Sequence, residues 1–226
     1  MYRLVYNIPN GIIIKVAIQF ESKGKPVERG RPRTFDEEKA LDTALAVFWR
    51  KGYQGASLAE LTQAMGISKP SLYAAFGNKE QIYLAALKRY REQQLFKHAR
   101  ALAAEPDLKT ALRRFLRSVA TMLTSPELPG GCMVVTTAVA CDTAALPSRV
   151  IAAIGETVNQ SSFGLLRERL EVELIRRHLP QGTKIEQLAD HFTIVMSGMA
   201  VVSKLGVSKQ RLFDTIEHAL CVIPER

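Results

Sequence analysis

Apolar residues along most of the chain recur at intervals of three and four, which is the period of an amphipathic helix. The pattern begins near residue 36 and continues to about residue 222, and no internal repeat or hairpin signature interrupts it. The sequence therefore predicts an all-α protein.

The first predicted helix follows Thr34 and Phe35. Asp36 is a good N-cap, and the two glutamates after it suit the positive end of the helix dipole. Gly52 is a natural place for this helix to stop. The residues predicted to share its buried face are Ala40, Leu41, Ala44, Leu45 and Phe48.

Two short helices are predicted next. Ser57 to Glu60 forms a capping box that opens the first of them, and Gly66 ends it. Ser68 caps the second, which runs over Lys69 to Phe76. Two short helices joined at a glycine are typical of a helix-turn-helix, although a generic three-helix bundle has the same spacing.

The rest of the chain predicts longer helices. Glycine and proline positions mark their ends. The predicted ranges are Lys79 to about Ala104, Asp107 to Thr124, Cys132 to Cys141, Ser148 to His178, Ile185 to Leu205 and Ser208 to Val222.

Charge and cysteine usage narrow the class of protein. The formal net charge of +9 favours a nucleic acid or another anionic surface as partner. The three cysteines form no C-x-x-C pair, which predicts a reduced, cytoplasmic protein. The apolar run from Gly11 to Phe20 is too short to span a bilayer and lacks a cleavage site, so neither a membrane partner nor a signal peptide is expected.

The chain divides into three parts on this basis. Residues 1–28 are interpreted as an extension, either disordered or a mis-called gene start, because the recognisable pattern begins only at Val27. Residues 29–80 are predicted to form the helix-turn-helix domain, and residues 81–226 a helical bundle.

The ordered motifs of residues 30–87 resemble the DNA-binding domain of the TetR family. The resemblance runs from Gly30 to Leu87, and one departure is Ala75, where many relatives carry a histidine. It rests on Gly30-Arg31-Pro32-Arg33, Ala44 to Phe48, Gly52-Tyr53, Ser57 to Leu61, Gly66 to Lys69, Ser71-Leu72-Tyr73, Phe76 and Asn78-Lys79-Glu80. The resemblance implies three N-terminal helices for DNA, followed by a bundle for ligand binding and dimerisation. It also implies a repressor that a small apolar or amphipathic ligand releases from its operator.

The helix over residues 69–76 is expected to lie in the major groove of double-stranded DNA. Lys69 sits in its first turn, where a cation opposes the helix dipole, so a DNA contact explains this residue better than stability does. By resemblance, Tyr73 and Lys79 reach the DNA backbone. The basic arm before residue 34 could enter the minor groove or be a solvated tail. The candidate DNA-binding residues are Arg31, Arg33, Ser57, Leu58, Lys69, Pro70, Ser71, Tyr73, Ala74 and Lys79.

A homodimer on a pseudo-palindromic operator is expected, because one short recognition helix binds too weakly alone. Two apolar stripes on the last two helices could form an intersubunit four-helix bundle, or could face the subunit's own core. The candidate interface residues are Phe192, Val195, Met199, Val202, Leu212, Ile216 and Ala219.

A ligand pocket between the long helices is implied by the resemblance. Its candidate lining is chosen by position and apolar character, and each residue could instead be plain core. The candidates are Phe115, Met122, Cys132, Met133, Thr136, Thr137, Phe163 and Leu166.

Other classes of function have weaker support. Cys132 and Cys141 are expected on opposite helix faces, and the four histidines show no ligand spacing, so no metal or other cofactor is predicted. A redox switch on Cys132 competes with an inert buried cysteine. No phosphate loop or nucleophile motif suggests an enzyme. The alternative function is a soluble helical carrier of apolar ligands.

Overall fold

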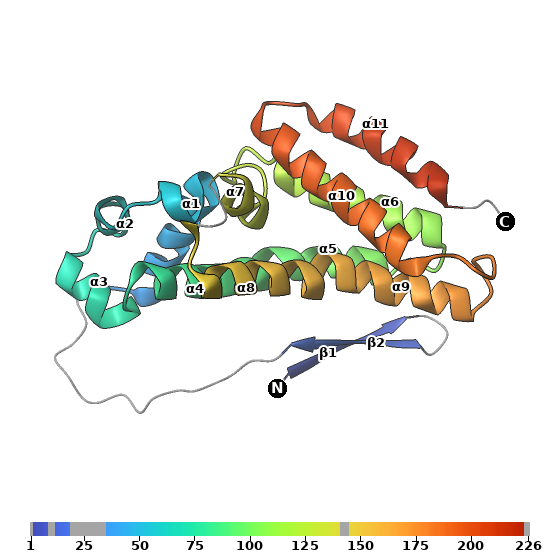
Figure 1. Cartoon of the computed structure of the whole chain (residues 1–226), viewed down its shortest axis with the longest axis horizontal. Helices are drawn as coiled ribbons and strands as arrows, with labels where there is room; N and C mark the ends of the chain where they lie inside the picture. The colour runs from blue at the N-terminus through green and yellow to red at the C-terminus, as the bar shows by residue number, and fades with distance from the viewer. Residues whose placement is uncertain (1, 9–11, 19–34, 141–144, 224–226) are drawn as a thin grey trace.

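The computed structural model describes residues 2–8, 12–18, 35–140 and 145–223. Figure 1 shows a head, formed by the helices of residues 37–76, at one end of two long helical rods that run side by side. The rods are residues 79–103 and 148–175, and the last two helices lie above them. The helical segments are α1 (Glu37–Gly55), α2 (Leu58–Met65), α3 (Lys69–Phe76), α4 (Lys79–Tyr90), η1 (Arg91–Leu95), α5 (Phe96–Ala103), α6 (Leu108–Leu123), α7 (Met133–Val139), α8 (Ser148–Val158), η3 (Asn159–Phe163), α9 (Gly164–Ile175), α10 (Ile185–Lys204), α11 (Lys209–Ala219) and η4 (Leu220–Val222).

The predicted caps of the head are present. Asp36 accepts hydrogen bonds from the backbone N–H groups of the first turn of α1, and Ser57 and Glu60 form the reciprocal capping box of α2. Gly66 ends α2 in the left-handed conformation. Gly52 does not end α1 as expected; it makes a kink at φ 71°, and helical hydrogen bonding resumes as far as Gly55. Leu72 is fully buried between these helices, so the head has its own core.

Each of the two long predicted helices is continuous but contains a π-helical turn. In the first rod η1 joins α4 to α5, and in the second η3 joins α8 to α9. Arg91 in η1 donates a hydrogen bond to the Gln160 side chain in η3, which connects the two irregular turns. Such turns often occur at functional sites, because they change which side chains face a cavity.

An N-terminal β-hairpin is the part of the fold that the periodicity analysis missed. Strands β1 (Tyr2–Ile8) and β2 (Ile12–Ile18) pair antiparallel. β1 lies beside α5, and β2 lies beside α9 (Figure 1). The hairpin falls in the stretch that was interpreted as an extension, where no strand was predicted; the Asn10-Gly11 pair between two apolar runs was the signal for it. The helical architecture is confirmed from residue 37 onward.

No helix in the described part of the chain combines the length and apolarity needed to cross a bilayer.

The predicted domain boundary at residue 80 falls in the first turn of α4, which runs without a break from the head into the bundle.

Arg89 ties α4 to α1 through a network of charged hydrogen bonds. Its guanidinium donates to both carboxylate oxygens of Asp42 and to Glu38, and the Gln93 amide also donates to Asp42, at 2.8 Å. The hydrogen bonds from Arg89 and the one from Gln93 lower the pKa of Asp42 below its ordinary value of 3.8. Ionised Asp42 therefore helps to hold the head against the rod.

This network predicts an acid-dependent loss of stability. Since the folded-state pKa of Asp42 is depressed, its contribution is complete above its ordinary pKa and is lost as the pH falls through the lowered value. We expect Asp42→Asn to be less stable than the unchanged protein at neutral pH, with the difference shrinking under acid. Urea titrations across the pH range would measure this. A stability difference that stays constant down to full protonation would contradict it.

Candidate functional site

The outer surface of α3 carries the candidate DNA contacts. Ser68 caps this helix by accepting from the Ser71 N–H, and Leu72 anchors its inner side in the core. Lys69, Pro70 and Ala74 are exposed, and Tyr73 keeps 45% of its surface accessible. The local sequence thus places one cation and one aromatic ring on a free helix face, as a groove-reading helix requires.

The candidate residues beside α3 make contacts within the protein itself. The ammonium of Lys79 lies 4.6 Å from the centre of the Tyr53 ring, and burial lowers the pKa of Lys79. The Ser57 hydroxyl caps α2, and Leu58 packs against the hydrophobic core. Arg31 and Arg33 lie outside the described residues. The DNA-contacting roles of all these residues remain predictions.

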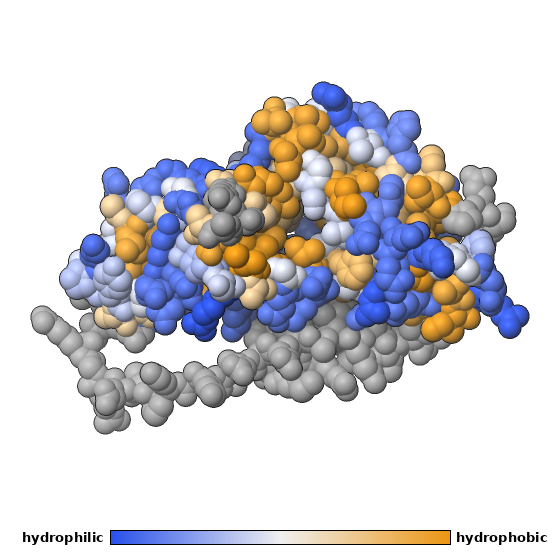
Figure 2. All heavy atoms as spheres, in the orientation of Figure 1, coloured by the Kyte–Doolittle hydropathy of each residue, from blue (hydrophilic) through white to orange (hydrophobic). Residues whose placement is uncertain are grey.

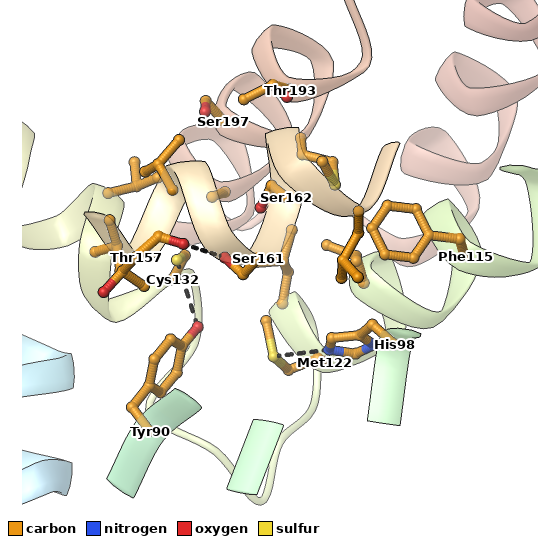
Figure 3. Close-up of a pocket in the computed structure, with 18 residues that line it drawn as sticks. Tyr90, His98, Phe115, Met122, Cys132, Thr157, Ser161, Ser162, Thr193 and Ser197 are labelled. Atoms are coloured by element: carbon orange, nitrogen blue, oxygen red, sulfur yellow. Dashed lines mark hydrogen bonds between the residues drawn. The ribbon is translucent and has the colours of Figure 1, made fainter. Parts of the chain in front are cut away.

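A cavity lies in the bundle between the two rods, α6, α7 and α10, and has a volume of about 690 Å³ including its open mouth (Figure 3). Figure 2 shows apolar surface along α10 and around a hollow beneath it. Part of the cavity lining is apolar, from Phe115, Val119, Met122, Leu123, Leu165 and Met196. The lining also contains hydroxyl and thiol groups, from Tyr90, Cys132, Thr157, Ser161, Ser162, Thr193 and Ser197.

Three of the predicted pocket residues, Phe115, Met122 and Cys132, line this cavity. The other five do not. They belong to the protein's own packing: the Thr137 hydroxyl accepts a hydrogen bond from Tyr83 at 3.0 Å, and Thr136 is buried with its hydroxyl unpartnered. Met133 and Leu166 are fully buried, and Phe163 packs against the core.

The pocket residues that the sequence reasoning missed come from all the elements around the cavity, and six of the fifteen lie in η3 and α10. For Ser161, Ser162 and Leu165, a regular helical period could not reveal which side chains face the cavity, because a π-helical turn shifts their phase.

His98 contributes an imidazole to the pocket lining. Its Nδ1 is 2.6 Å from the Ser118 hydroxyl, and burial lowers its pKa to about 4. The imidazole is therefore neutral at neutral pH. Within the described part of the chain, the lining contains no Asp, Glu, Lys or Arg, so these residues present only uncharged groups to the cavity.

The predicted interface stripe mostly faces the subunit's own core. Phe192, Met199, Leu212, Ile216 and Ala219 are buried within the single chain, and Val195 and Val202 are half-buried. Of the two roles that the sequence left open for these stripes, burial of the five residues agrees with packing in the subunit's own core, because α10 and α11 pack on α6 and on each other. The opposite face of α10 leaves apolar residues exposed: Ile194 at 70%, Val201 at 39% and Leu205 at 79%.

Sequence comparison identifies the family. Residues 40–86 match the model of "Bacterial regulatory proteins, tetR family", and residues 109–219 match "Tetracyclin repressor-like, C-terminal domain". The HTH-type transcriptional repressor ComR of Escherichia coli K12 is 32% identical over 198 residues, which is 87% of this chain and 93% of ComR. The chain belongs to the TetR family. It is a transcriptional regulator, as the resemblance of residues 30–87 implied.

A solved structure of a relative bound to DNA has a similar fold. The regulator CifR, as a cysteine mutant in complex with 26-base-pair operator DNA, is 38% identical with a TM-score of 0.80, over 86% of this chain and 100% of CifR. The repressor BdcR of Escherichia coli K12 is 30% identical over 84% of this chain and 90% of BdcR. These relatives are transcriptional regulators.

Proposed function

We propose that this TetR-family regulator is a homodimeric repressor that binds a pseudo-palindromic operator and leaves it when a small molecule fills the cavity between the rods. The single observation that carries the DNA part is the free face of α3, with Lys69 and Tyr73 outward and Leu72 inward. The repressor ComR and the operator complex of CifR support the same assignment.

The exposed side of α10 is the dimer surface in this proposal. Ile194, Val201 and Leu205 lie on one face, with exposed Ser197 and Gly198 between them. Small residues let two such helices approach closely, and burying the three apolar side chains against a second copy removes them from water. Dimerisation sets the two α3 helices about 34 Å apart or a multiple of that, matching successive major grooves.

Ligand release would work through the rods. Since α4 begins in the head and reaches the cavity at Tyr90, a change in the cavity can move α3 relative to its copy. An allosteric coupling of about 1–3 kcal/mol would change operator affinity about 5–150-fold.

Fluorescence anisotropy of the purified chain tests the proposal. The DNA beside its own gene is compared with a scrambled duplex of equal length, at several salt concentrations. We expect tighter binding to the native DNA, with log affinity falling linearly in log salt. Absence of binding even at low salt would favour the ligand carrier instead.

Lys69→Ala tests the role of α3 directly. Removing this exposed cation is expected to weaken binding and to reduce the salt slope by about one per contact, hence about two per dimer. Lys184→Ala is the matched control, because Lys184 is also exposed but caps the end of α10 remote from the head (Figure 1). An unchanged salt slope in Lys69→Ala would remove α3 from the DNA interface.

A further inference from the structure

Helix α7 touches the cavity with one end and the DNA-binding head with one side. Cys132, Val134 and Val135 line the cavity. On its other side α7 packs against the α1 kink so closely that a Cβ added to Gly52 would lie 3.2 Å from the Thr136 carbonyl oxygen. Because this packing is close, we infer that a movement at the start of α7 displaces the backbone of α1.

Trp49 of α1 contacts both the start of α7 and helix α4. Its indole Nε1 donates a 2.9 Å hydrogen bond to the Gly131 carbonyl, just before α7. Its ring packs edge-on against Tyr90 of α4, with centroids 4.7 Å apart, and only 2% of the residue is exposed. The next residue of α1, Arg50, receives a 3.1 Å hydrogen bond on its carbonyl from the Lys204 ammonium of α10. The last regular turn of α1 is thus fixed by the elements that build the cavity.

The Tyr90 hydroxyl is the polar group of this junction that reaches the cavity. It is buried and donates to the Cys132 thiol at 3.4 Å, and Figure 3 shows the two groups meeting beside Thr157 and Ser161. Sulfur is a weak acceptor, so a buried hydroxyl with this partner would gain from an oxygen acceptor. Burial and the neighbouring Cys132 raise the pKa of Tyr90 well above its usual value, which keeps the hydroxyl protonated as a donor.

The cavity also restricts the charge of its ligand. A buried ion needs a counter-charge or a set of hydrogen bonds. Among the described residues the lining offers neither a carboxylate nor a cationic side chain, and the hydroxyls of Thr157, Ser161 and Thr193 already donate to backbone carbonyls of their own helical segments. The Lys204 ammonium, the cation of this junction, is directed to the Arg50 carbonyl. The apolar wall at Phe115 suits a hydrocarbon portion.

We propose that the cavity takes an uncharged, oxygen-bearing compound with a short apolar tail, whose oxygen replaces Cys132 as acceptor for the Tyr90 hydroxyl, and that Trp49 transmits this exchange to α1. The inference rests on the proposed function for its consequence at DNA, but the binding step stands on the cavity alone. Tyr90 is the ligand-reading residue, and Trp49 is a positioning residue.

The single tryptophan of the chain provides the measurement. Trp49 emission is followed while 2-heptanone or methyl hexanoate is added, with hexanoate and hexylammonium as charged probes of similar length. We expect saturable changes in emission with the two neutral probes only. The same neutral probes are expected to weaken operator binding in the anisotropy assay.

Two tyrosine variants separate the hydroxyl from general packing. Tyr90→Phe removes one oxygen from the cavity and is expected to weaken 2-heptanone binding about fivefold, the value of one hydrogen bond. Tyr83→Phe is the matched control, because Tyr83 is an equally buried tyrosine of α4 whose hydroxyl bonds Thr137 outside the cavity. It is expected to keep the affinity for 2-heptanone.

Trp49→Phe tests transmission. Ligand-detected NMR is expected to show 2-heptanone still bound, while the ketone no longer releases DNA as effectively. Charged probes that bind as well as neutral ones, no saturable response to either neutral probe, or equal losses in the two tyrosine variants would each overturn the proposal. Failure of the protein to bind any DNA would instead refute the proposed function, and would leave the emission result to decide the ligand class.

Discussion

Arg169→Leu is expected to lower the free energy of unfolding by about 3–5 kcal/mol, the usual cost of breaking a buried ion pair from one side. Arg169 and Glu173 are both fully buried on α9, and their side chains lie 3.1 Å apart. The Arg169 guanidinium also donates to the carbonyls of Leu102, Glu105 and Pro106, at 2.8–3.0 Å. These carbonyls lie where α5 ends and the chain turns toward α6.

The large effect follows from what the substitution leaves behind. Leucine cannot donate to the three carbonyls. It also leaves the buried Glu173 carboxylate with only two partners in the described structure, His178 at 2.7 Å and the Arg176 guanidinium at 4.0 Å. Burial lowers the pKa of Arg169, because desolvation disfavours the charged form of the guanidinium. Its hydrogen bonds and Glu173 must compensate for that desolvation.

Urea unfolding at matched protein concentration measures the loss, since dimer stability depends on concentration. Arg167→Leu is the control: Arg167 is on the same helix and pairs with Glu171, but both side chains keep 42% of their surface exposed. Its loss is expected to cost less than about 1 kcal/mol. If the two substitutions lowered the free energy of unfolding equally, the buried network would contribute no more to stability than an exposed ion pair. Arg169→Lys keeps the charge without the planar fork and is expected to fall between them.

Ile194→Glu is expected to convert the protein to a monomer and to weaken operator binding about a hundredfold or more, because the two recognition helices no longer bind as one unit. Ile194 is 70% exposed in the single chain, so the substitution has no intrachain core to disrupt. In the dimer it would place a carboxylate within an apolar helix face, where burial of the charge opposes association.

Ile175→Glu provides a matched control. Ile175 is 80% exposed at the end of α9, away from the α10 face that includes Val201 and Leu205. Light scattering would give the mass of each variant, and anisotropy its affinity for the operator. A dimeric Ile194→Glu protein with normal DNA affinity would move the interface to another surface.

The sequence by itself was enough to predict the helices and the head. Periodicity and caps such as Asp36 and Ser57 are local, because the hydrogen bonds they make lie within one turn. The same local rules placed Leu72 inside and Lys69 outside. The hairpin was also within reach of sequence reasoning through Asn10 and Gly11, but a search for helical periods passed over it.

Only the tertiary structure decided which apolar faces are buried in the subunit and which groups meet at the cavity. A helix with apolar residues on two faces, as α10 has at Phe192 and Ile194, gives no sequence signal for which face packs inside. The junction of Trp49, Tyr90 and Gly131 likewise depends on long-range contacts. Trp49 is separated from Tyr90 by 41 positions in the sequence and from Gly131 by 82. Local physics fixes the turns of a helix, whereas the rotation of one helix against another is set by the packing of the whole core.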